Sequence, residues 1–147
     1  MGLFSTNGGA SSLVLRLVLG FVMFAHGSQK VLGWFGGHTL FVTLNMFTQQ
    51  MHMPLPLAWL VIAAEFGGGL GLIVGFLTRI AAFGIACDML GAILLVHWRF
   101  GLFANWFGNQ KGEGIEYHLL VIAICIALII LGGGALSLDH AIAGGSQ

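Results

Sequence analysis

Seven ionisable side chains interrupt the long apolar stretches of this sequence and are its best candidates for chemistry: Arg16, His26, Lys30, Glu65, Arg79, Asp88 and Glu116. A carboxylate in an apolar environment loses its charge unless a cation lies nearby, so acids and bases placed there can hold one another's charge or pass protons. Ionisable groups inside a membrane are costly and indicate a functional site by default. We therefore favour a functional polar site over ion pairs that only lock the fold.

Helical periodicity places three of these groups on one side of the first apolar stretch. At about 100° per residue, Arg16, His26 and Lys30 fall within an arc of roughly 120°. A charged residue that faces lipid at the centre of a span costs on the order of 2.5–3.5 kcal/mol. We therefore expect this stripe to face other segments, which must supply its partners.

The acidic residues occur at similar depths in later stretches. Glu65 follows Pro56 by nine residues and Asp88 follows Arg79 by nine, so each lies about 13 Å along its helix at 1.5 Å per residue. Small residues share the face of each carboxylate, and we expect that face to point inward: Gly68 and Gly69 with Glu65, Gly84, Gly91 and Ala92 with Asp88, and Ala123 and Ala127 with Glu116.

Helical phase also predicts the positions of a glycine ridge and of two histidines. Gly67, Gly71 and Gly75 form a GxxxGxxxG ridge beside the Glu65 face, and such a ridge lets another helix backbone approach closely. His97 and His118 project roughly opposite the carboxylates of their own helices, so we expect them at the membrane interface and not in the polar site.

The composition is that of an integral membrane protein. Of 147 residues, 58% are hydrophobic and only 7% are charged, whereas soluble domains carry about 25% charged residues. Lys and Arg balance Asp and Glu at five each, so no basic surface attracts nucleic acid. We expect a single domain, residues 1–147, in contact with the lipid bilayer.

Four apolar stretches approach the ~20 residues that cross a bilayer, at about 12–32, 57–77, 79–98 and 115–131. They predict an all-α membrane protein built as a four-transmembrane-helix bundle. An even number of spans puts both termini on the same side of the membrane. Lys and Arg are divided almost evenly between the two sides, so the positive-inside rule does not decide the orientation.

The connection between the first two predicted spans contains a short amphipathic segment at about 39–51. Leu40, Leu44, Phe47 and Met51 recur there at helical spacing, which predicts a helix that lies in the membrane interface. Together with the aromatic loop at 98–107, this helix is expected to form a lid over one end of the bundle.

The two cysteines and the histidines predict no metal or haem site. Cys87 and Cys125 form no CxxC pair, and we interpret both as small buried hydrophobic residues. The histidines are scattered along the chain, and two separated cysteines do not suffice for an iron–sulfur cluster.

Several motifs, in order along nearly the whole chain, resemble those of the DoxX family of small membrane proteins. They are Arg16 and Gly20 in LRLVLG, His26-Gly27 and Lys30, then Glu65 with Gly68-Gly69, GFLTR at 75–79, Gly114-Ile115-Glu116, and LSLD at 136–139. The resemblance implies a four-helix bundle in the inner (cytoplasmic) membrane of a prokaryote, with cytoplasmic termini favoured. It matches Arg16, Gly20, His26, Lys30, Glu65, Thr78, Arg79 and Glu116 to family positions, whereas Asp88 has no clear counterpart.

The resemblance further implies a subunit linked to quinone redox chemistry. His26, Lys30, Glu65 and Glu116 are then the candidate quinone-binding residues, and Arg16, Thr78, Arg79 and Asp88 the supporting polar network. Because no electron carrier is evident in this chain, electrons would come from a partner protein. Other subunits, in a homo- or hetero-oligomer, are also expected as partners. Two alternatives stay open: a non-catalytic anchor or assembly subunit of a larger complex, and a small-molecule or proton transporter that uses the carboxylates.

Overall fold

The computed structural model describes residues 2–7 and 9–144, and in that part of the chain it is helical with no strands. The α-helices are α1 (Gly9–Val31), α2 (Leu40–Asn45), α3 (Leu55–Ile62), α4 (Gly68–Val74), α5 (Thr78–Ala92), α6 (Glu116–Leu131) and α7 (Leu138–Gly144). Wider π turns continue α2 over Met46–Gln50, join α3 to α4 over Ala63–Gly67, and extend α5 over Ile93–His97. The all-α prediction is confirmed.

Within the residues that the structure describes, three helical segments are long and apolar enough to cross a membrane. They are Gly9–Val31, Leu55–Val74 and Thr78–Phe100, with 23, 20 and 23 residues, and a hydrocarbon core about 30 Å thick needs about 20. The fourth apolar helix, α6, has 16 residues. The chain is therefore an integral membrane protein. The predicted helix at 39–51 is present as α2 and its π turn.

Local sequence explains where the spans begin and end. Pro54 precedes α3 and Pro56 occupies its first turn, where the missing N–H leaves no hydrogen bond unmade. Gly75 ends α4 with a φ of 70° and Leu77 precedes α5 with a φ of 50°. This left-handed backbone reverses the chain within a few residues, so α4 and α5 form a tight antiparallel pair.

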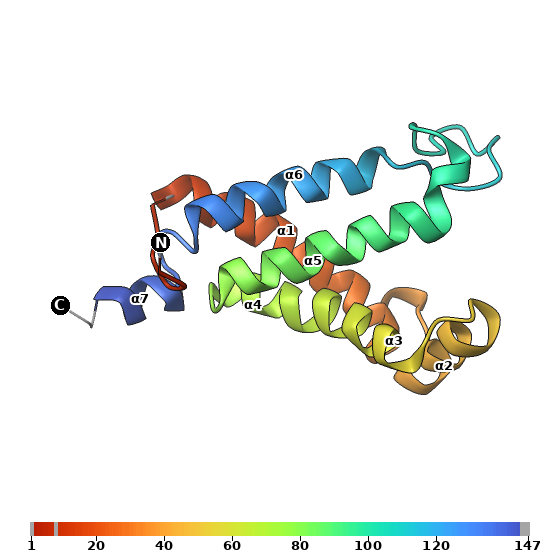
Figure 1. Cartoon of the computed structure of the whole chain (residues 1–147), viewed down its shortest axis with the longest axis horizontal. Helices are drawn as coiled ribbons and strands as arrows, with labels where there is room; N and C mark the ends of the chain where they lie inside the picture. Colours follow the sequence, from red (N-terminus) through yellow and green to blue (C-terminus); the bar gives the residue numbers. More distant parts are fainter. Residues whose placement is uncertain (1, 8, 145–147) are drawn as a thin grey trace.

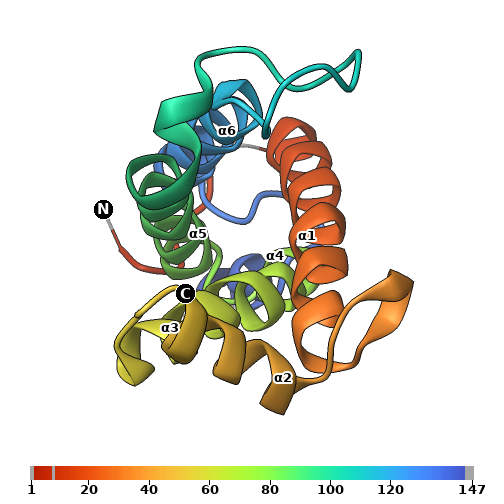
Figure 2. The ribbon, with the colours of Figure 1, turned by 90° about the vertical axis from the view of Figure 1, so that its right-hand side faces the viewer.

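The long helices lie side by side along the length of the molecule (Figure 1). The first and last described residues lie at one end, and α2 and the 101–114 loop lie at the other. Viewed from the α2 end, α1, α4, α5 and α6 surround a common axis (Figure 2). Along that axis the core packs residues of every long helix: Leu19, Met23, Leu72, Ala82, Ile85, Met89, Val121, Cys125 and Leu128.

Glycines bring α1 and α4 together, and most are not those of the GxxxGxxxG ridge. A Cβ added at Gly27 would lie 2.5 Å from the Phe66 backbone, and one at Gly69 would collide with the backbone of Phe24. Gly20 is similarly close to α4. Of the ridge itself, Gly67 has open space around it, Gly71 faces the α4–α5 turn, and Gly75 ends α4.

Candidate functional site

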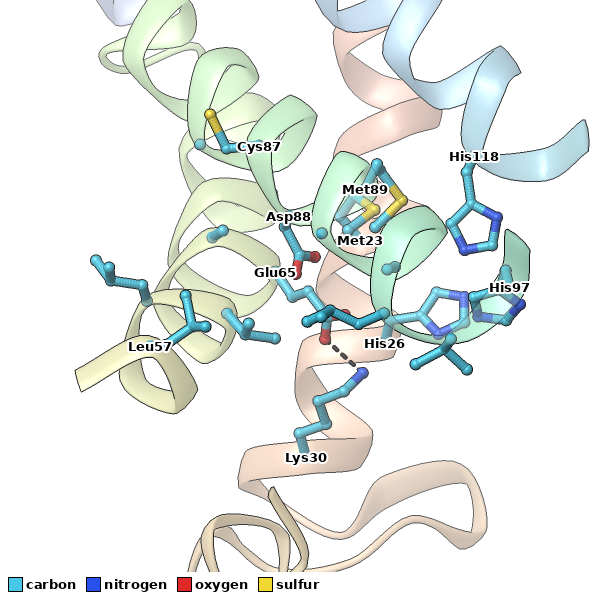
Figure 3. Close-up of a pocket in the computed structure, with 18 of the residues that line it drawn as sticks. Met23, His26, Lys30, Leu57, Glu65, Cys87, Asp88, Met89, His97 and His118 are labelled. Atoms are coloured by element: carbon cyan, nitrogen blue, oxygen red, sulfur yellow. Dashed lines mark ion pairs between the residues drawn. The ribbon is translucent and has the colours of Figure 1, made fainter. Parts of the chain in front are cut away.

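A cavity of about 820 Å³ lies near the α2 end of the molecule, between the long helices. Its walls are mostly apolar. The polar side chains that line it come from every long helix: His26 and Lys30 from α1, Glu65 from the π turn between α3 and α4, Asp88 and His97 from α5 and its extension, and Tyr117 and His118 from α6. Figure 3 shows most of these groups pointing into a shared space. Phe47 and Met51 from the α2 segment, and Glu113 and Gly114 from the 101–114 loop, cover one end.

The centre of the polar site is an ion pair between Lys30 and Glu65. The Lys30 Nζ lies 2.5 Å from the Glu65 Oε2, drawn as a dashed line in Figure 3. Only 7% of Glu65 is exposed, so removing Lys30 would leave a buried carboxylate without its ion-pair partner. The sequence prediction that a cation on the first helix accompanies Glu65 is confirmed for Lys30.

Asp88 lies next to this pair, on the Glu65 side of it (Figure 3). Among the described residues, its Oδ2 is buried and has no hydrogen-bond partner, and the same holds for the Nδ1 of His118. Buried polar atoms are normally hydrogen-bonded, and an unpaired one costs about 1–3 kcal/mol. Asp88 and His118 both line the cavity, so an acceptor and a ring nitrogen without hydrogen-bond partners lie buried in its wall.

A row of rings follows one wall of the cavity. The centroids of His26 and Tyr117 are 6.1 Å apart, those of Tyr117 and His118 5.4 Å, and those of His118 and His97 4.2 Å. The Nδ1 of His97 lies 2.8 Å from the carbonyl oxygen of Glu113. Because a carbonyl only accepts, His97 carries a proton on Nδ1 and directs Nε2 elsewhere.

The expectation that His97 and His118 lie away from the polar site is wrong for both. Nine residues of regular α-helix would put His97 opposite Asp88, but the π turn over Ile93–His97 adds a residue and rotates it back toward the cavity. His118 belongs to the buried face of α6, with Val121, Cys125 and Leu128. These four residues follow an i, i+3, i+7, i+10 spacing, and this spacing in the sequence could have shown that His118 faces the interior.

Glu116 does not line the cavity. Its Oε1 accepts a hydrogen bond of 2.8 Å from the indole Nε1 of Trp106 in the loop. The small-residue face of α6 points outward, with Ala123 exposed, so the prediction that this face points inward is wrong. Small residues mark the inner face only where helices approach closely, and α6 packs on α5 through larger side chains.

The prediction that the small-residue face points inward is confirmed for the helices that carry Glu65 and Asp88. Gly68 and Gly69 are buried with Glu65, and Gly84, Gly91 and Ala92 line the cavity with Asp88. The interpretation of the cysteines as buried holds for Cys125 and is wrong for Cys87, which is exposed and lines the cavity.

Arg16 lies at the opposite end of the molecule from Lys30 and Glu65. Its guanidinium donates to five backbone carbonyls, those of Leu72, Ile73, Gly133, Ala135 and Leu136. These carbonyls belong to the end of α4 and to the segment between α6 and α7, where helical carbonyls lack partners. Arg16 therefore joins three segments at this end and does not reach the cavity.

Arg79 and Thr78 also lie at this end. Arg79 donates to the carbonyls of Ile129 and Ser5. Thr78 is fully buried, and its backbone N–H donates to the Asp139 carboxylate at 2.9 Å, next to the Leu77 N–H at 2.8 Å. The structure thus divides the predicted set in two, with His26, Lys30, Glu65 and Asp88 around the cavity and Arg16, Thr78 and Arg79 at the other end.

The arrangement suits a neutral polar group held in an apolar pocket. The cavity supplies donors in Lys30 and the histidines and acceptors in two carboxylates, so it can hydrogen-bond both carbonyls and hydroxyls. Among the residues that the structure describes, no three His, Cys, Asp or Glu side chains are grouped to hold a metal ion.

Comparison with known proteins gives a family and two relatives. A family model described as DoxX matches residues 11–98. The chain is 31% identical over 128 residues to the protein named "Putative oxidoreductase CatD" of Bacillus subtilis (strain 168), covering 87% of this chain and 84% of that one. It is also 31% identical over 128 residues to "Inner membrane protein YqjF" of Escherichia coli (strain K12), covering 87% and 88%. No solved structure matches the chain significantly.

Proposed function

Because this chain belongs to the DoxX family of membrane proteins, we propose that it is a membrane subunit that binds a quinone in the cavity beside Lys30 and Glu65. The observation that carries the proposal is the unpartnered Oδ2 of Asp88 next to the Lys30–Glu65 pair, buried in the wall of a largely apolar cavity of about 820 Å³. The name of one relative contains the word oxidoreductase, which supports a redox role.

The proposed membrane placement has four spans. Helix α6, with 16 residues, is about 24 Å long at 1.5 Å per residue, and the segments at its two ends extend it across the remaining depth. The α2 segment then lies in the interface, over one end of the cavity. Both termini face the same side, which we propose to be the cytoplasmic side of an inner membrane.

The cavity suits the head group of a quinone. A quinone ring is flat and apolar on its faces, and it carries two carbonyl oxygens that accept hydrogen bonds. Lys30, His26 and His118 are the donors within the cavity, and cavities of roughly 300–1,000 Å³ accommodate ligands of this size. We propose Glu65 and Asp88 as the groups that accept from the hydroxyls of the reduced form.

The proposed chemistry is a two-electron reduction. The quinone takes up two electrons and two protons, one proton on each carbonyl oxygen, and leaves as the quinol. The electrons come from a redox subunit bound to this chain. Protons reach the ring through side chains of the cavity, with Asp88 and the row of histidines as the route, and the reverse reaction returns them.

Binding of decylubiquinone to the protein in lipid nanodiscs tests the proposal, with uptake by protein-free nanodiscs subtracted. We expect Glu65→Gln and Asp88→Asn each to weaken binding of the reduced form, decylubiquinol, measured in the same way, by about tenfold or more, since each variant loses the charged acceptor of a quinol hydroxyl and such a hydrogen bond is worth about 1.5–3 kcal/mol. Glu116→Gln is the matched comparison, because its carboxylate contacts Trp106 outside the cavity.

Thermal unfolding of each variant separates loss of binding from loss of fold. Unchanged affinity for decylubiquinol in both Glu65→Gln and Asp88→Asn would overturn the assignment of the site. Failure of the unmodified protein to bind decylubiquinone would overturn the proposed function, and a role as an anchor or assembly subunit would then be favoured.

A further inference from the structure

The cavity has an opening on its side, between α3 and α5. Leu60 of α3 and Phe83 and Leu95 of the α5 segment all line the cavity, yet they are 65%, 63% and 65% exposed. Met23 and Glu65 line its inner part and are almost completely buried. The cavity therefore runs from a buried polar floor to an exposed rim.

This rim lies within the membrane. Leu60 belongs to the apolar segment Leu55–Val74, and Phe83 and Leu95 belong to Thr78–Phe100. Leu57 and Cys87 complete the rim, so no charged side chain stands between the cavity and the outside on this face. An exposed apolar rim at that depth faces acyl chains and not water.

Two other sides of the cavity are closed by helix contacts. Gly27 and Gly69 hold α1 against the π turn and α4 at backbone distance, and α5 packs on α6 through Ile85 and Cys125 of the core. Figure 1 shows α4 close to α5, with α3 farther from α5 toward the α2 end. The opening is the place where this helix pair diverges.

We infer that the ligand enters this site sideways from the bilayer, between α3 and α5, and that its hydrocarbon tail stays in this portal while its head reaches Lys30, Glu65 and Asp88. The inference rests on the proposed function and extends it, because it selects quinones with a long tail over free rings. The portal follows α5 from Phe83 to Leu95, about 18 Å at 1.5 Å per residue, which is long enough for a tail of ten or more carbons.

The charges of the floor argue against lipid head groups as the occupant. Two carboxylates, Glu65 and Asp88, face one lysine there. A phosphate would add a further negative charge beside them, and like charges at short range repel. A neutral ring with carbonyl or hydroxyl groups meets no such repulsion.

Gly91 offers a way to fill the portal without disturbing the fold. It lies within α5, lines the cavity, and a Cβ added there meets no atom within 4 Å. Gly91→Leu therefore places a side chain in the cavity and also replaces glycine by a better helix former. Gly67→Leu is the matched control, because Gly67 has the same open surroundings and does not line the cavity.

The test uses a ubiquinone analogue with a ten-carbon tail that ends in a photoreactive diazirine, bound to the protein in nanodiscs. Adducts that decylubiquinone competes away are mapped by mass spectrometry. We expect them on peptides that contain Leu57–Leu60 and Phe83–Leu95. Gly91→Leu should reduce this labelling by about tenfold or more, whereas Gly67→Leu should leave it unchanged.

Binding of duroquinone, which has a ring and no tail, distinguishes the failure of the portal from the failure of the proposed function. Competable adducts confined to residues 46–53 or 101–114 would overturn the portal and leave quinone binding in place. Duroquinone binding without any competable tail adduct would also overturn it. If the protein neither binds duroquinone nor forms a competable tail adduct, both the proposed function and the portal would be overturned.

Discussion

Arg16 and Glu65 are two buried charges that the protein stabilises in different ways. Arg16 is 1% exposed, and five backbone carbonyls accept its hydrogen bonds, which is the full donor capacity of a guanidinium. Glu65 instead depends on a single lysine that is itself partly exposed. The first arrangement fixes helix ends in place, and the second leaves polar atoms available to a ligand.

The role of Arg16 predicts that lysine cannot replace it. Arg16→Lys keeps the charge but offers one ammonium where three segments need a planar fork. We expect a loss of about 2–4 kcal/mol in stability, since several carbonyls lose their donor in a buried place. Thermal unfolding in detergent, followed by circular dichroism, measures it. A thermal midpoint equal to that of the unmodified protein would show that the carbonyl contacts contribute nothing.

At the residue scale, the sequence predicted which charges are buried better than what they contact. The depth of Glu65 and the stripe of Lys30 follow from helical periodicity, so their pairing was predictable. The partners of Arg16 were not, because backbone carbonyls at helix ends leave no pattern of residue types. Glu116 was predicted to face inward because alanines share its helix face. In the structure its carboxylate instead accepts a hydrogen bond from Trp106 of the 101–114 loop.

The contact between α1 and α4 is the closest helix packing described in the fold, and it depends on the absence of side chains. Gly69 lies against the backbone of Phe24, and Gly27 against that of Phe66. Because the helices touch through backbone atoms, neither can move apart without losing the whole interface. This rigid pair holds Lys30 opposite Glu65.

Gly69→Ala should therefore destabilise the protein, by about 1–3 kcal/mol as in other overpacked interiors. Gly67→Ala should be neutral or stabilising by up to about 1 kcal/mol, because alanine favours the helix and meets no neighbour there. The two variants differ by two positions in one helical segment, so their thermal midpoints can be compared directly. Equal midpoints would contradict the close packing.

At the element scale, the sequence predicted where the helices lie but not their exact phase. Apolar length and the prolines located the long helices to within a few residues. The three π turns have no signature in residue type, yet the one over Ile93–His97 rotates His97 into the cavity. A regular helix drawn from the sequence therefore assigned the histidine to the wrong side.

The whole molecule has two polar ends with different tasks, separated by an apolar core. At one end, Arg16, Arg79 and Asp139 bind backbone groups and join the N-terminal segment, the α4–α5 turn and the chain after α6. At the other, the cavity lies under α2 and the 101–114 loop. The sequence predicted this lid from the amphipathic segment at 39–51 and the aromatic loop at 98–107, but it did not separate the two polar sets.

A topology with four spans makes a prediction about labelling from the two sides of a membrane. In a background of Cys87→Ser and Cys125→Ala, Asn7→Cys and Ala143→Cys should react with a membrane-impermeant maleimide from the same side. Asn109→Cys should react from the other side. Labelling of positions 7 and 143 from opposite sides would show that α6 does not cross, and would overturn the four-span arrangement.

The portal that we infer between α3 and α5 has a consequence for the concentration scale that its ligand would follow. A hydrophobic ligand that enters through the acyl chains is drawn from the lipid phase, so its occupancy is set by its mole fraction among the lipids. Quinones are abundant in that thin layer and scarce outside it, so a site of modest intrinsic affinity can still be filled. Changes in lipid composition would then alter turnover without any change in the protein.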